Sequence, residues 1–195
     1  MIPQATSLDR EAPGLYLHVP FCTSKCRYCG FYSQPLAGRD VDRLVSALVR
    51  EVQEYRNVAA VRTIYIGGGS PTSLPVHRLA GLIETVASIW PQAQEFTVEC
   101  NPGQVGVEML SMLARRGVNR LSFGVQSFHA AELEILGRRH TADDARRSIE
   151  QAQERIRSLK GVLFDLDGVL TPTAEVHMLA WSRLFTPYFE SRGIA

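Results

Sequence analysis

Hydrophobic and polar positions follow two different periods along the first 155 residues. Residues 14–20 (GLYLHVP) and 63–66 (TIYI) are rich in aliphatic and aromatic side chains and are short, which predicts strands. Residues 40–55 place apolar side chains three and four positions apart, which predicts an amphipathic helix that begins after Asp40. The same two patterns recur, with further strands expected at 95–99 and 120–125 and further helices at 76–89, 107–116 and 142–156. Strand, loop and helix repeated with short connections predict an α/β fold with a parallel sheet.

The polar motifs of the chain follow predicted strands. A cysteine-rich loop comes after residues 14–20, the turn Gly67–Pro71 (GGGSP) comes after 63–66, and the turn Asn101–Gly103 comes after 95–99. In parallel α/β folds, ligands bind at the carboxyl ends of the strands. We therefore expect these motifs to form one site.

Composition and charge exclude several classes of protein. Of the 195 residues, 45% are hydrophobic and 21% charged, which is typical of a globular protein. The 21 Lys and Arg residues nearly balance the 20 Asp and Glu residues, which argues against general nucleic-acid or polybasic membrane binding. The first residues show no signal-peptide pattern, and no apolar run approaches the roughly 18 residues of a membrane span. We expect a cytoplasmic protein without a membrane span.

Three cysteines crowd into one loop. Cys22, Cys26 and Cys29 have the spacing C-x3-C-x2-C, and such thiols in a reducing compartment are typically metal or cluster ligands. Three thiolates can hold three irons of a [4Fe-4S] cluster and leave the fourth iron open to an exogenous ligand. A zinc site with His18 as its fourth ligand is the alternative. Cys100 is expected to be a small buried apolar residue.

Four stretches between residues 14 and 154 carry a family resemblance. They are LYLHVPFCTSKCRYCGFYS, IYIGGGSPTSL, FTVECNPG and NRLSFGVQSFHAAELEILGRRHTADDA, and together they resemble the radical SAM superfamily. Within it they resemble the branch of oxygen-independent coproporphyrinogen III oxidases and heme chaperones. The resemblance implies a partial (β/α) barrel of parallel strands that binds a [4Fe-4S] cluster and S-adenosylmethionine (SAM).

One position separates the two groups within this branch. The oxidases carry a further cysteine two residues after the third ligand, where this chain has Phe31. The resemblance therefore implies a heme chaperone, which would bind heme or a porphyrin and pass it to an unknown acceptor protein. The decarboxylating oxidase remains the alternative.

The resemblance also implies roles for individual residues. Cys22, Cys26 and Cys29 would hold the cluster. Glu99 suits ribose hydroxyls or a sulfonium, and the fork of Arg138 suits a carboxylate. His129 and His140 are weighed as heme ligands and assigned instead to surface or supporting positions. The residues matching SAM-contacting positions are Tyr16, Tyr28, Gly68, Gly69, Ser70, Glu99, Gln126 and Arg138.

The resemblance to the radical SAM superfamily ends near residue 154, and a different one begins. Residues 156–195 are similar to the start of a haloacid-dehalogenase-like phosphatase or phosphoglucomutase, with the motif DLDGVL at residues 165–170. In that family Asp165 would be the nucleophile and Asp167 the acid and base, with Mg²⁺ bound only if the motif is active. Two domains are thus expected, a truncated radical SAM core at 1–155 and a phosphatase fragment at 156–195. A Mg²⁺-dependent phosphatase and a chimera without function are further alternatives.

The incoming segment has a predicted place in the sheet. A barrel that ended at strand 120–125 would leave a strand edge with unpaired amides and carbonyls. Residues 161–166 (GVLFDL) form an apolar run of the kind that pairs in a parallel sheet, and they follow a helix long enough for a crossover. We expect them to pair in parallel with strand 120–125, with Asp165 or Asp167 at the carboxyl end, followed by a helix at 173–189.

Overall fold

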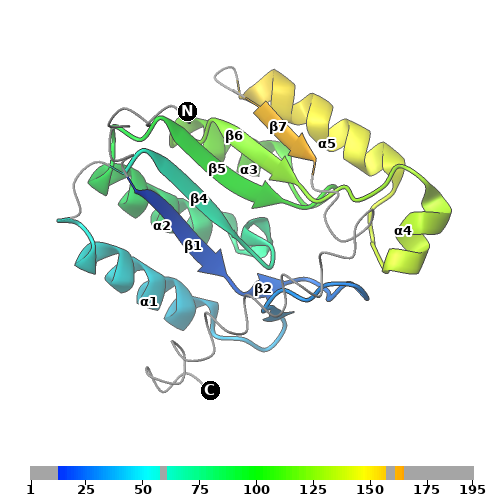
Figure 1. Cartoon of the computed structure of the whole chain (residues 1–195), viewed down its shortest axis with the longest axis horizontal. Coiled ribbons are helices and arrows are strands. Elements are labelled where there is room, and N and C mark those ends of the chain that lie inside the picture. Colours follow the sequence, from blue (N-terminus) through cyan, green and yellow to red (C-terminus); the bar gives the residue numbers. More distant parts are fainter. Residues whose placement is uncertain (1–12, 58–60, 157–160, 165–195) are drawn as a thin grey trace, which may run out of the picture.

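A single parallel sheet organises the computed structural model, which describes residues 13–57, 61–156 and 161–164. Its five strands follow one another in the order β1-β4-β5-β6-β7, and every neighbouring pair is parallel (Figure 1). An order that follows the chain without reversal is that of a barrel wall, since a doubly wound sheet reverses direction at its centre. The expected α/β fold and partial barrel are confirmed. The strands are Gly14–Val19 (β1), Thr63–Gly68 (β4), Glu95–Cys100 (β5), Arg120–Phe123 (β6) and Gly161–Phe164 (β7).

Helices connect successive strands of the sheet. The predicted helices are present as Val41–Glu54 (α1), Val76–Ile89 (α2), Val107–Arg115 (α3) and Ala142–Arg155 (α5). Asp40 caps α1 as expected, because its carboxylate accepts a hydrogen bond from Arg43 N at 2.9 Å. The smaller elements are the 3₁₀ turn Pro71–Ser73 (η1), the parallel pair Phe21–Cys22 (β2) and Gln34–Pro35 (β3), and the helix Ala130–Leu136 (α4).

Helix α4 was not expected from the sequence. It has seven residues, too few for its apolar positions to repeat as a helical pattern. It ends at Gly137, whose φ of 70° is the left-handed conformation that glycine adopts without strain. The strand predicted at 120–125 is correspondingly too long, because Val125 N donates to Phe123 O and turns the chain out of the sheet.

The two faces of the sheet differ in chemistry. The register places Leu17, Ile66, Val98 and Leu121 on one face, where they belong to the apolar core. The same register places Tyr16, Tyr65, Thr97 and Arg120 side by side on the other face. Successive side chains of a strand point to opposite faces of the sheet. Four strands paired in this register therefore give the sheet one apolar and one polar face. The polar face also carries Glu99 and Ser122, opposite each other at the carboxyl ends of β5 and β6.

The incoming segment pairs where it was expected. Strand β7 lies beside β6 in parallel register, with Arg120 opposite Gly161 and Phe123 opposite Phe164. The prediction of a fifth strand after residue 160 is confirmed for Gly161–Phe164. Asp165, Asp167 and the helix predicted at 173–189 lie outside the described residues. Within the described ranges, every helix is too short or too polar to cross a bilayer.

The pairing of β7 predicts a pattern of amide hydrogen exchange. In a parallel sheet, alternate amides of a central strand point to each of its neighbours, so all four amides of β6 should be protected. In a variant that ends after Ile156, β6 becomes an edge strand. Amides that faced β7 should then exchange about tenfold faster or more, while those of β4, between β1 and β5, stay protected. Unchanged exchange across β6 in the shortened variant would show that β7 does not hold this edge.

Candidate functional site

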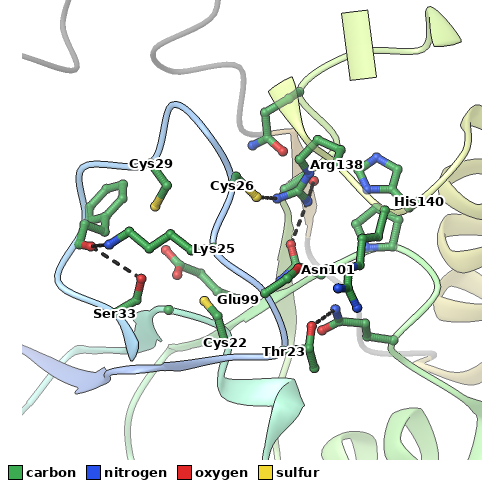
Figure 2. A pocket seen from close by; sticks show the side chains of 18 of the residues that line it. Cys22, Thr23, Lys25, Cys26, Cys29, Ser33, Glu99, Asn101, Arg138 and His140 are labelled. Carbon is green, nitrogen blue, oxygen red and sulfur yellow. Dashed lines mark hydrogen bonds between the residues drawn. The ribbon is translucent and has the colours of Figure 1, made fainter. Parts of the chain in front are cut away.

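A cavity of about 390 Å³ opens at the carboxyl ends of β4, β5 and β6, against the cysteine loop (Figure 2). The predicted site residues that line it are Cys22, Cys26, Tyr28, Cys29, Gly68, Gly69, Glu99, Gln126 and Arg138. Tyr16 and Ser70 do not line it. The ring of Tyr16 lies beside that of Tyr65, and Ser70 donates a hydrogen bond to Gln104, which lines the cavity. The expectation that the motifs meet at one edge of the sheet is correct.

The cysteine loop is fixed at both ends and braced across its middle. Gln34 N donates to Pro20 O at 2.7 Å and Leu36 N donates to Cys22 O at 2.8 Å, which closes the base of the loop. Within the loop, Lys25 Nζ donates to the Phe31 carbonyl at 2.9 Å. The far side is held by Arg27 N, which donates to Leu136 O at 3.1 Å. The loop is therefore shaped by the protein itself.

The three thiols of the loop are partly exposed toward the cavity and form no disulfide. Burial raises the pKa of the Cys22 thiol. Among residues 13–57, 61–156 and 161–164, no three His, Cys, Asp or Glu side chains lie close enough to hold a single metal ion. A [4Fe-4S] cluster instead spreads its cysteine ligands over separate irons, and three separated sulfurs facing one cavity suit that donor set.

The alternative zinc site is not supported at its fourth ligand. His18 Nε2 lies 2.8 Å from the Tyr32 carbonyl and Nδ1 lies 3.0 Å from the Tyr16 hydroxyl, so hydrogen bonds engage both ring nitrogens. Cys100 is buried with the apolar core on the helix-covered face, and its thiol donates to Val98 O at 3.6 Å. It does not line the cavity, as expected of a buried apolar residue.

The glycine-rich turn lies directly against the start of the cysteine loop. Gly69 N donates to Val19 O at 2.8 Å and Ser70 N donates to Phe21 O at 2.7 Å. A Cβ added to Gly69 would lie 2.6 Å from Phe21 O and 3.0 Å from Cys22 Sγ. Glycine is therefore required here by the close approach of two backbone segments. The bare backbone of Gly68 and Gly69 also forms the wall of the cavity that a ligand could approach.

Glu99 is held in one orientation by two donors. Its Oε1 accepts a hydrogen bond from Tyr65 Oη at 2.6 Å, and its Oε2 accepts one from Gly68 N at 2.9 Å. The ring of Tyr16 lies beside that of Tyr65, with centroids 5.9 Å apart. Burial, and then the charge of Glu99, raise the pKa of both tyrosines, so both hydroxyls stay protonated. A fixed carboxylate at the cavity wall is suited to bind hydroxyls or a cation.

Two amide side chains of the site had no role assigned from the sequence: Gln104 was missed, and Asn101 was expected only as part of the turn after residues 95–99. Gln104 Nε2 donates to Thr23 Oγ1 at 2.8 Å, and Gln104 Oε1 accepts from Ser70 Oγ at 3.2 Å. One side chain thus joins the cysteine loop, the glycine-rich turn and the loop after β5. Asn101 accepts from Arg138 at 2.7 Å. A single Asn or Gln carries no sequence signal; their position just after a strand's carboxyl end was the only clue.

The segment after β6 has a strained backbone. Gln126 has φ 58°, the only such non-glycine residue in the described part of the chain, and its side chain is buried. This conformation costs about 1–3 kcal/mol and occurs preferentially at binding sites. Nearby, His140 donates from Nε2 to the Val125 carbonyl at 3.1 Å. Burial, and then the charge of Arg138, lower the pKa of His140 to about 4, so this side chain is neutral. His140 is buried and His129 is exposed.

Comparison with known proteins gives one consistent family. The family model described as "Radical SAM superfamily" matches residues 16–173, which includes β7. The heme chaperone HemW of Bacillus subtilis is 40% identical over 148 residues, covering 71% of this chain and 38% of the relative. HemW of Lactococcus lactis is 38% identical over 141 residues, covering 71% of this chain and 37% of the relative. The chain thus spans little more than a third of the length of these relatives.

A solved structure extends the similarity to the fold. Coproporphyrinogen III oxidase (HemN) of Escherichia coli, described as a radical SAM enzyme, superposes with a TM-score of 0.69 at 26% identity. The match covers 78% of this chain and 36% of that one.

The approach of the glycine-rich turn to the cysteine loop predicts opposite effects at two glycines. Gly69→Ala should lower the free energy of unfolding by about 1–3 kcal/mol, because its Cβ meets a backbone carbonyl that cannot move alone. Gly81→Ala, inside α2 with open space around it, should raise it by about 0.5–1 kcal/mol. Chemical denaturation monitored by circular dichroism measures both. Equal effects of the two substitutions would contradict the close contact.

Proposed function

The chain belongs to the radical SAM superfamily, and from this we propose that its cavity binds a [4Fe-4S] cluster and SAM in a protein that handles heme or a porphyrin. Cys22, Cys26 and Cys29 are the proposed cluster ligands. The observation that carries this proposal is the cysteine loop, whose three thiols face one cavity beside a glycine turn.

Three sulfur ligands suit a cluster with one open iron. A [4Fe-4S] cluster has four irons to be ligated, so three cysteines would leave one iron open. The family resemblance implies that SAM would bind this iron through its amino and carboxylate groups. Together the cluster and SAM supply radical chemistry when both are bound. The contribution of the chain is to hold the three sulfurs and to shape the adjacent space.

We assign the residues of the cavity wall to parts of SAM as the family resemblance implies. Gly68 and Gly69 expose backbone to its methionine end, and the fixed carboxylate of Glu99 suits its ribose or sulfonium. Gln126, in the segment after β6, and Arg138, in the segment after α4, supply polar side chains. Tyr28, between two cluster ligands, lines the cavity and is the residue that the family resemblance assigns to the adenine. Tyr16 and Ser70 act indirectly, through Tyr65 and Gln104.

The proposed substrate is heme or a porphyrin, and the proposed activity is transfer to an acceptor protein. Two relatives at 38–40% identity are named heme chaperones. Phe31, which lines the cavity, stands where the oxidases of the resembled branch have a further cysteine. The absence of that cysteine favours heme handling over decarboxylation, and the oxidase is the second candidate.

The domain boundary belongs to the same proposal. We propose that residues 1–155 are a radical SAM core and that 156–195 are a segment of different origin whose first strand, β7, pairs with β6. The boundary is proposed from the DLDGVL motif, and the radical SAM family model extends past it to residue 173. Phosphatase activity rests on Asp165 and Asp167, which lie outside the described residues, and Mg²⁺ belongs only to that alternative.

Anaerobic reconstitution with iron and sulfide tests the cluster. The wild-type chain should bind about four irons and turn brown, because three thiols are available. Replacing Cys22, Cys26 and Cys29 by Ala should abolish iron binding. Cys100→Ser is the matched control and should leave iron content unchanged, since that thiol is buried on the other face. Loss of iron in the control, or retained iron in the triple variant, would refute the ligand set.

Heme binding is tested separately on the reconstituted protein. Hemin added at equal concentration should give a bound Soret band, and the absorbance should move to an apo heme protein added afterwards. A chain that binds its cluster and SAM but shows no bound Soret band would end the heme proposal and leave the cluster proposal standing.

A further inference from the structure

Arg138 makes a contact that the SAM-binding role does not require. Its Nη1 donates to the sulfur of Cys26 at 3.3 Å (Figure 2). We propose that Arg138, through this N–H···S hydrogen bond to a cluster ligand, acts as a positioning residue and raises the reduction potential of the cluster. This inference rests on the proposed function, because it requires that Cys26 bind the cluster.

The guanidinium is anchored so that it stays at the sulfur. Its Nη2 donates to Asn101 Oδ1 at 2.7 Å and also to the Gly124 carbonyl. These two acceptors lie on the loops after β5 and β6, so two strands of the sheet fix the side chain. Both N–H groups of Nη2 are thereby used, which leaves Nη1 with one N–H for the sulfur and one for a ligand. Arg138 can therefore contact the sulfur and a SAM carboxylate together.

The backbone brings the cysteine loop to the same place. Arg27, next to Cys26, donates its N–H to Leu136 O at 3.1 Å, at the end of α4. Gly137 then turns the chain in the left-handed conformation, and a Cβ there would lie 3.1 Å from Arg27 Cγ. The turn sends the next residue, Arg138, back over the loop. A backbone bond and a side-chain bond thus join Cys26 and its neighbour to one helix end.

The charge of Arg138 is not neutralised where it acts. Its two anchors, an amide oxygen and a backbone carbonyl, are uncharged. No ion pair found within the described ranges includes Arg138. Arg138 therefore offers a cationic donor to the cluster ligand.

A cationic donor on a cluster sulfur favours the reduced state. Reduction adds a negative charge to the cluster, and hydrogen bonds to its sulfurs stabilise that charge and raise the potential. Charge-assisted hydrogen bonds are roughly twice as strong as neutral ones. Removing this bond should therefore make the cluster harder to reduce without removing any ligand.

Arg139 offers a matched control for charge alone. It carries the same charge, follows Arg138 directly and lines the same cavity. It is exposed, and none of the hydrogen bonds found in the described part of the chain joins it to a cysteine. Arg138→Gln and Arg139→Gln thus remove equal charge and differ in the bond to sulfur.

Redox titration of the reconstituted protein without SAM tests the proposal, since no SAM carboxylate then adds its negative charge next to the guanidinium. At a fixed solution potential, Arg138→Gln should lower the ratio of reduced to oxidised cluster about tenfold. This corresponds to a reduction potential lower by ~59 mV for one electron. Arg139→Gln should change it much less. Asn101→Ala, which keeps the charge but loosens the anchor, should shift the ratio in the same direction and by less. Iron content is measured in each sample, so that only loaded protein is compared.

Each outcome decides the proposal. A loaded Arg138→Gln variant with the wild-type potential, or an equal shift in Arg139→Gln, would overturn the role of the bond and leave the proposed function intact. If Arg138→Gln does not load, a loaded Asn101→Ala variant with unchanged potential overturns the proposal, and a lowered potential supports it. A wild-type chain that binds no cluster would overturn the proposed function, and this inference with it.

Discussion

The site depends on two backbone hydrogen bonds between the glycine-rich turn and the start of the cysteine loop. Gly69 N and Ser70 N donate to Val19 O and Phe21 O, and Phe21 immediately precedes the first cysteine. They can form only because Gly69 has no side chain, since a Cβ would meet the Phe21 carbonyl. These bonds join the segments that follow β1 and β4 into one continuous wall of the cavity. The sulfurs and the bare backbone then face the same cavity.

The sheet supports this wall by separating its two faces. Apolar residues from successive strands lie in register on the face that belongs to the core, so the strands are packed without using the polar face. The polar face is then free to carry Tyr65 and Glu99 toward the cavity. Because strand side chains alternate, a shift of one residue in register would exchange the faces and remove both. Packing and site chemistry are therefore fixed by the same register.

The sequence predicts most of this architecture and less of the site's detail. The strands and long helices follow from periodicity, and the cavity follows from the rule that ligands bind at strand carboxyl ends. Helix α4 could not be predicted, because seven residues give no repeated pattern. The left-handed conformation of Gln126 and the bridge made by Gln104 arise only when distant loops meet. The thiol of Cys26 was predicted as a ligand, but its bond to Arg138 spans 112 residues and has no local signal.

The central claim is that the cavity holds a cluster with three protein ligands and one open iron. Mössbauer spectroscopy of the chain reconstituted with ⁵⁷Fe, before and after addition of SAM, measures this directly. The three-cysteine loop predicts that SAM changes the signal of roughly one iron in four and leaves the other three as they were. Four irons that are all unaffected by SAM in a fully loaded protein would contradict the claim.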